Sequence, residues 1–397
     1  MTKKWVNIAD VLFFQEGPGV RNTQYTTSGV KLLNVANLVD SKVDLSKSDR
    51  YISEEEAYGK YRHFLCDDGD FVIASSGIKV EYIDKKMGFV DASMLPLCMN
   101  TSTIRFKVLD ENQLRIRYFM YYLKSKHFKE QLTKQITGSA QLNYGPSHLK
   151  KMIMPLIDIT VQDEIISCMD KLQSIIETRQ RELIELDRLM KARFVELFGD
   201  PRSNPFGFEK KRLKDTCKVI TGNTPSRAIA EYYGDYIEWI KTDNIVSGIL
   251  NPTQATESLS EKGMNVGRTV EKDSILMACI AGSIASIGRV CITDRTVAFN
   301  QQINAVVPEQ YNILFLYVLF QMSKDYLVED INMALKGILS KSKLEEKEFI
   351  IPPMDLQEQF SDFVKQVNKS KFDTMTFAPI YAIINLYLHT YFYQGRR

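Results

Sequence analysis

The chain has 397 residues, of which 44% are hydrophobic and 25% are charged, and its formal net charge is +2. These values are ordinary for a globular protein with room for two domains. The six cysteines form no Cys-x-x-Cys pair and the four histidines are isolated, which argues against a disulfide framework and a zinc site. The first residues, Met-Thr-Lys-Lys-Trp, lack the apolar core of a signal peptide, so we expect a cytoplasmic protein.

Residues 1–157 mix strand and helix patterns and form the first predicted domain. Alternating apolar residues predict strands at 31–38, 71–75 and 103–108, a helical pattern covers 113–135, and a further strand is expected at 152–155. The segment from Arg105 to Lys151 contains ten basic residues and three acidic ones. This basic stripe could neutralise phosphates, but it could equally be the solvated face of a helix over an aromatic core.

Residues 158–200 have a different character. Apolar side chains alternate at spacings of four and three, which predicts one long helix from about Thr160 to Phe198 that needs a partner helix. At about 1.5 Å per residue it would span about 58 Å, more than one turn of B-DNA at about 34 Å. Gly199-Asp200-Pro201 should end it sharply.

The second half of the chain repeats the first. Met154-Pro155-Leu156 with Gln162 returns as Ile351-Pro352-Pro353 with Gln357, and other echoes keep nearly the same offset. Residues 201–354 are therefore a second mixed domain, and 355–372 begin a second long helix. Such a duplication makes a covalent pseudo-dimer, which suits a target that also comes in two halves.

The last residues, 373–397, break the repeat. From Thr374 to Gln394 there is no Asp, Glu, Lys or Arg, and Pro379 interrupts the stretch. A membrane span is a poor interpretation because polar residues fall inside a barely sufficient length. We expect a truncated second helix, which leaves open self-association through the truncated helix or an inactive subunit.

Polar and glycine-rich clusters occupy the loops of both domains, and their side chains suit phosphates and base edges. Each alone could be an ordinary turn or cap. In the first domain the DNA-binding candidates are Arg21, Asn22, Gln24, Asn37, Ser76, Lys79, Lys126, Ser139, Gln141 and Asn143. In the second they are Thr221, Asn223, Thr224, Ser226, Arg227, Lys241, Asn244, Ser283, Asn300, Gln301 and Lys336.

No pattern of catalytic chemistry accompanies these loops. The sequence has no P-loop, no glycine-rich cofactor loop that opens a helix, and no Asn/Asp-Pro-Pro-aromatic tetrapeptide. The pattern indicates a reader without a catalytic or metal site of its own.

The order of these features resembles the DNA specificity subunits of type I restriction–modification systems. The resemblance covers about residues 1–371 and is most specific at Thr221–Arg227, Gly267–Thr269, Ser286–Val290, Phe299–Ile303 and the two Pro-to-Gln junctions. It implies an α+β fold with two similar mixed α/β target-recognition domains, separated by long antiparallel coiled-coil helices and related by a pseudo-twofold internal duplication.

The resemblance also implies a function and partners. Each domain would read one half of a bipartite site in double-stranded DNA, with the helices as a spacer. Two methylation subunits would bring S-adenosylmethionine for adenine N6, and two restriction subunits would bring ATP and Mg. This chain would bind no cofactor.

Two other interpretations stay open. One is a stand-alone double-stranded DNA-binding protein, and the other is a coiled-coil scaffold whose paired domains bind protein or a membrane surface. The salt dependence of DNA binding distinguishes DNA-binding proteins from a scaffold, because the affinity of a DNA-binding protein falls steeply with salt in proportion to the phosphates it neutralises.

Overall fold

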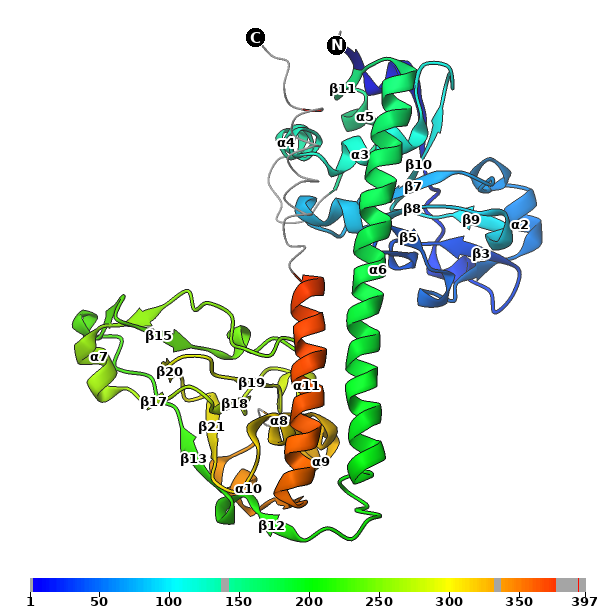
Figure 1. Ribbon diagram of the computed structural model, residues 1–397. Helices are drawn as coiled ribbons and strands as arrows, with labels where there is room; N and C mark the ends of the chain where they lie inside the picture. Colours follow the sequence, from blue (N-terminus) through cyan, green and yellow to red (C-terminus); the bar gives the residue numbers. More distant parts are fainter. Residues whose placement is uncertain (1–2, 137–142, 332–336, 376–391, 393–397) are drawn as a thin grey trace. The chain divides into compact units, whose positions relative to one another are not determined.

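The structure, a computed structural model, describes residues 3–136, 143–331, 337–375 and 392 (Figure 1). The described chain divides into two compact units: the residues up to Glu177 together with Phe392, and the residues from Thr178 to Met375. Each unit combines a four-stranded antiparallel sheet, a mixed sheet that contains one parallel strand pair (β3 with β9, or β15 with β20) and helices, and the predicted α+β class is confirmed.

The first unit is built on two small sheets and a strand pair. The four-stranded sheet has the order β2-β10-β7-β8 and the three-stranded sheet the order β6-β3-β9, while β1 pairs with β11. The bounds are β1 Lys4–Asn7, β2 Leu12–Glu16, β3 Val30–Leu33, β6 Tyr51–Ile52, β7 Phe71–Ala74, β8 Met87–Phe89, β9 Leu97–Met99, β10 Thr103–Val108 and β11 Ile153–Leu156. A small ribbon joins β4 Leu38–Val39 to β5 Lys42–Val43.

The second unit repeats this plan. Its four-stranded sheet has the order β13-β21-β18-β19, its five-stranded sheet the order β14-β16-β15-β20-β17, and β12 pairs with β22. The bounds are β12 Lys210–Arg212, β13 Cys217–Thr221, β14 Tyr233–Gly234, β15 Ile237–Ile240, β16 Ser258–Leu259, β17 Thr269–Val270, β18 Ile275–Ala278, β19 Val290–Ile292, β20 Val297–Phe299, β21 Ile303–Pro308 and β22 Glu348–Ile350.

Single backbone hydrogen bonds show how closely the two units correspond. Leu32 N donates to Arg50 O at 2.8 Å, and Trp239 N donates to Glu257 O at 3.0 Å. At the end of the next strand, β9 or β20, Asn100 N donates to the Leu33 carbonyl and Asn300 N to the Ile240 carbonyl, both at 3.0 Å. Position 32 therefore corresponds to 239, and position 50 to 257.

The helices around the sheets are mostly short. In the first unit they are α1 Ile8–Val11, α2 Glu54–Tyr58, α3 Ile116–Lys124, α4 Lys126–Gln135 and α5 Pro146–Leu149. In the second they are α7 Glu261–Val266, α8 Ile313–Met322, α9 Lys324–Val328, α10 Lys341–Glu346 and α11 Met354–Met375.

Two predicted elements differ from the structure. The single helix expected over 113–135 is wrong: α3 ends and α4 begins at Ser125, whose hydroxyl accepts a hydrogen bond from Phe128 N at 3.3 Å. The strand expected over 31–38 ends at Leu33, because a 3-10 turn at Val35–Asn37 follows. The strands at 71–75 and 103–108 are confirmed within a residue.

The long helix is confirmed. α6 spans Ile159–Phe198, and Gly199 ends it with a φ of +70° that favours glycine. In the second unit the end of α6 runs antiparallel to α11 (Figure 1): the Phe194 and Phe360 rings lie 5.5 Å apart, and Asp187 pairs with Lys371. The atypical tail lies outside the described residues beyond Met375, except for Phe392, which is buried in the first unit.

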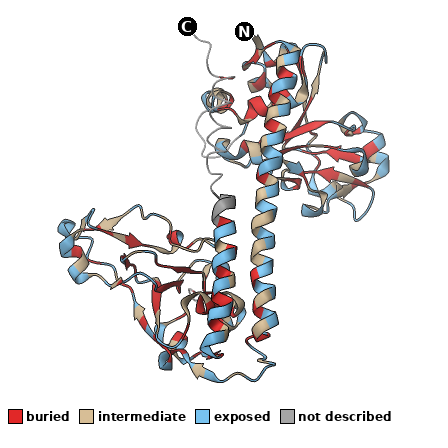
Figure 2. Cartoon of the chain, in the orientation of Figure 1, coloured by how far each residue is buried: buried red, intermediate tan, exposed pale blue. Residues whose placement is uncertain are grey.

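The core of each unit lies where the four-stranded sheet meets its helices. Figure 2 shows buried residues along these strands, while α6 is mostly exposed or half-buried with a few buried residues along it. Phe71, Phe106 and Phe119 are buried in the first unit, and Phe194, Phe198 and Phe315 in the second.

The glutamine that recurs near the start of each long helix has a structural role in both units. Gln162 Oε1 accepts from Arg115 N, and Gln357 Oε1 accepts from Asn312 N, both at 2.9 Å. Each glutamine thus fastens the start of its long helix to the residue before α3 or α8.

Candidate nucleic-acid interface

In the second unit, several candidates gather where β13, β15 and β20 end. Gly222 N donates to Ile303 O at 3.1 Å, and a Cβ at this glycine would lie 2.2 Å from Asn300 O. The glycine therefore lets the loop at 221–227 pass directly over the end of β20. Thr224 donates to the side chain of Gln301 on the neighbouring turn, and Thr221 Oγ1 donates to Asn304 Oδ1 at 2.8 Å.

The same loop carries a cation held over aromatic rings. Arg227 lies 4.6 Å from the centre of the Tyr233 ring and 5.2 Å from that of Trp239. Its guanidinium pairs with Glu257 at 2.7 Å, and Glu257 also accepts a hydrogen bond from Lys241. The hydrogen bond from Lys241 is the main reason that the pKa of Glu257 lies below its ordinary value. The carboxylate thus joins two of the predicted cations.

The remaining second-unit candidates are less tightly grouped. Asn223 lies in the same loop and donates from Nδ2 to Val266 O at 2.8 Å. Ser226 is exposed beside it. Ser283 is exposed in the loop after β18 and bonds to Ser286 at 3.0 Å.

The first unit builds a corresponding loop from different side chains. Gly17 is its counterpart to Gly222, since a Cβ there would lie 2.4 Å from Asn100 O. Arg21 and Asn22 are exposed on this loop. Gln24 Nε2 donates to Glu56 Oε1 at 2.6 Å, so its amide is already engaged.

A second group in the first unit lies beyond β7. Ser76 forms a bridge with Asn143 and donates to Ser102 Oγ at 2.6 Å. Lys79 is exposed on the same segment, while Lys126 lies on α4 and pairs with Glu130 at 3.7 Å. The candidates Ser139, Gln141 and Lys336 lie outside the described residues.

Three candidate asparagines are buried and have structural partners. Asn37 is 0% exposed and accepts from Asn34 N at 2.9 Å, and its counterpart Asn244 is 7% exposed and accepts from Lys241 N at 3.0 Å. Asn300 is also buried, and its Oδ1 accepts from Gln302 N at 3.1 Å. All three amides close tight turns in the interior instead of facing outward, and a DNA-binding role for these residues stays a prediction.

Comparison with known protein families matches both halves of the chain. A family model described as the type I restriction modification DNA specificity domain matches the chain twice, at residues 8–188 and 205–379. The chain belongs to this family. The expected resemblance is therefore confirmed, including the internal duplication.

Individual relatives of this specificity-family chain are distant. It is 33% identical over 146 residues to the HindI specificity subunit of Haemophilus influenzae, covering 35% of this chain but only 31% of that protein. It is 24% identical to the MjaIX specificity subunit of Methanocaldococcus jannaschii over 70% of this chain and 68% of the relative.

Solved structures agree on the fold. The type I S subunit from M. genitalium covers 100% of this chain with a TM-score of 0.60 at 14% identity, and 97% of that chain is matched. A chain from a study of type I complex assembly and conformational transition gives 0.54 at 15% identity, with 98% and 97% covered.

Sequence reasoning missed three residues of the specificity-family loops. Tyr233, Trp239 and Glu257 surround Arg227, yet they are distant from it in sequence or fall within strand patterns. The available signal was Trp239, one of only two tryptophans and two residues before the candidate Lys241.

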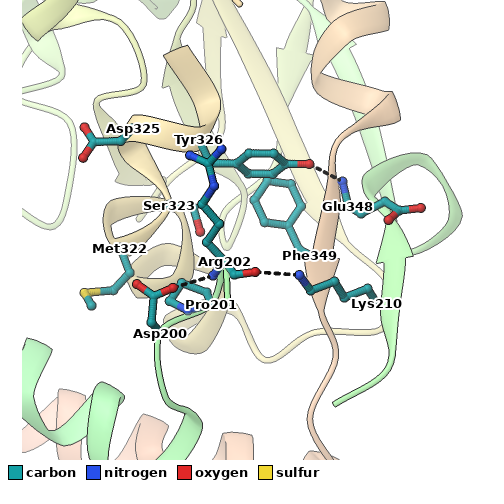
Figure 3. A pocket seen from close by; sticks show the side chains of 10 residues that line it. All are labelled: Asp200, Pro201, Arg202, Lys210, Met322, Ser323, Asp325, Tyr326, Glu348 and Phe349. Carbon is teal, nitrogen blue, oxygen red and sulfur yellow. Dashed lines mark hydrogen bonds between the residues drawn. The ribbon is translucent and has the colours of Figure 1, made fainter. Parts of the chain in front are cut away.

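A pocket of about 250 Å³ lies elsewhere in the second unit (Figure 3). Arg202 enters it and pairs with Glu329 at 2.7 Å, Lys210 Nζ donates to Arg202 O at 2.9 Å, and Glu348 N donates to the Tyr326 hydroxyl at 3.1 Å. Because these polar groups hold one another, we assign the pocket no ligand. Across the described part of the chain, no group of three or more His, Cys, Asp or Glu could hold a metal, and no helix is long and apolar enough to span a membrane.

Proposed function

We propose that this chain is the DNA-recognition subunit of a type I restriction–modification complex, and that each mixed domain reads one half of a bipartite duplex site. One observation carries the proposal: two loops on matching backbones present different polar side chains. Where the first domain has the exposed Arg50, the second has Glu257. Two domains that read different half-sites need different hydrogen-bond donors and acceptors on the same backbone arrangement.

The proposed division is residues 1–157 and 201–354 for the two readers, with 158–200 and 355–372 as the spacer. α6 has 40 residues, a rise of about 60 Å at about 1.5 Å per residue. Within the second unit, the α6 side chains of Ile184 and Leu189 are 52% and 51% exposed, which suits docking of a partner. We propose methylation subunits there, with self-association of α6 as the competing use of the same surface.

Chemistry belongs to the partners in this proposal. Two methylation subunits would supply S-adenosylmethionine and two restriction subunits ATP and Mg, in the cytoplasm, while this chain contributes recognition. The readers would use the exposed candidates, led by Arg21 and Asn22 in the first domain and by Thr224, Arg227 and Gln301 in the second.

The test is selection from a library of random DNA duplexes by the purified full chain with its methylation subunit. The expected result is a split motif, two short specific blocks around an unread spacer. Affinity for the selected duplex should fall steeply between about 50 and 200 mM salt, by on the order of 10³-fold or more if six or more phosphates are contacted. Enrichment of one contiguous motif, or binding that is insensitive to both sequence and salt, would contradict the proposal.

A further inference from the structure

Arg227 is an exposed cation of the second recognition domain that three side chains hold in place. Its side chain is 56% exposed, although its guanidinium lies against two aromatic rings and pairs with Glu257. By comparison, Lys262 pairs with Glu231 with both side chains about 70% exposed, which is the usual weak surface pair.

The partners of Arg227 are themselves fastened to its loop. The Tyr233 hydroxyl donates to Pro225 O at 2.7 Å, and Trp239 Nε1 donates to Asn223 O at 3.3 Å. Glu257 receives Lys241 on its other oxygen. The guanidinium is thus held beside two rings and paired with one carboxylate oxygen, which lowers the entropy cost of using its remaining donors.

A fixed, exposed guanidinium suits one ligand in particular. Guanine presents O6 and N7 side by side in the major groove, and a planar fork of N–H donors matches both at once. A phosphate accepts from many directions, so it needs neither the ring platform nor the carboxylate that orients the fork, and a nearby carboxylate repels it.

The first domain does not reproduce this arrangement. At the position of Glu257 it has Arg50, which lies 5.3 Å from the centre of the Tyr25 ring, and at the position of Lys241 it has Asn34. The arrangement therefore distinguishes the second half-site from the first.

We propose that Arg227 reads a guanine in the half-site of the second domain and that Glu257 is its positioning residue. The inference rests on the proposed function and adds the identity of one base pair in the second half-site. A G·C pair is required at one position of that half-site, and the first half-site is independent of both residues.

The experiment repeats the duplex selection with R227K, R227A, E257Q and the matched control K262A, in the full chain with its methylation subunit. R227K keeps the charge but removes the fork, so it should lower the preference for guanine at one position about 10- to 100-fold. The salt dependence and the other positions should not change. E257Q should relax the same position by a smaller factor, and K262A should select the parental motif. Thermal unfolding of each variant confirms that it is folded.

The outcomes separate the two proposals. If the parent selects a split motif and R227K selects it unchanged, or if R227A weakens all sequences alike and lowers the salt slope by about 1, Arg227 contacts phosphate and the inference fails while the function stands. A second half-site without a G·C pair also overturns the inference. If the parent selects no split motif, the proposed function fails and the inference fails with it.

Discussion

Replacing the repeated glutamine with leucine should destabilise both units, and by unequal amounts. Gln162 is 0% exposed and makes three hydrogen bonds to the backbone: it accepts from Arg115 N at 2.9 Å and donates to Gln113 O at 2.8 Å and Ile157 O at 2.9 Å. Leucine has a similar volume but pairs with none of these groups. At about 1 kcal/mol for each group left without its partner, Gln162→Leu should cost about 3 kcal/mol.

Gln357 has fewer such partners. It is 1% exposed, accepts from Asn312 N at 2.9 Å and donates to Pro352 O at 2.8 Å. On the same basis Gln357→Leu should cost about 2 kcal/mol. Gln366, exposed on α11, is the matched control, and its replacement should stay within about 0.5 kcal/mol.

The assay is urea unfolding, with hydrogen-exchange mass spectrometry of peptides that cover the start of each long helix. Each variant should lose protection at its own junction, and Gln162→Leu should lose more free energy of unfolding than Gln357→Leu. If both variants have the free energy of unfolding of the Gln366 control, or if Gln357→Leu loses more than Gln162→Leu, the hydrogen bonds do not fasten the helices as we argue.

Two further substitutions in the second unit test the packing of α6 and the position of the loop at 221–227. Phe194→Ala removes a fully buried ring and should lower the free energy of unfolding by about 3–5 kcal/mol. Its neighbour Val195 is 45% exposed, so Val195→Ala should change that free energy by less than about 1 kcal/mol. Equal effects of the two substitutions would contradict the pairing of α6 with α11. Gly222→Ala places a Cβ against Asn300 O and should weaken DNA binding at every sequence by moving the loop, while Gly282→Ala, with open space around the Cβ, should bind as the parent does. Unchanged binding by Gly222→Ala would show that the loop position is unimportant.

The large features were predictable because they come from periodicity and repetition. The heptad pattern located α6 within one residue, and the Pro-to-Gln echoes identified the duplication. The break at Ser125 was missed because the apolar pattern continues across it, and only the side-chain cap on Phe128 reveals the new start.

The candidate interface was predicted less completely. Composition marks loops rich in asparagine, but it does not say which amides turn inward, as those of Asn37 and Asn244 do. Glu257 was missed for the opposite reason: it is an ordinary surface residue in sequence, and only the pairing of β15 with β16 brings it beside Arg227.

The central claim, two readers for two half-sites, is tested most directly in cells. The chain would be co-expressed with its methylation subunit in a host without DNA methylation, and N6-methyladenine would be mapped across the genome. The account predicts a split motif methylated on both strands, in which R227K alters one half only. Methylation of a single contiguous motif, or a change in both halves in that variant, would contradict it.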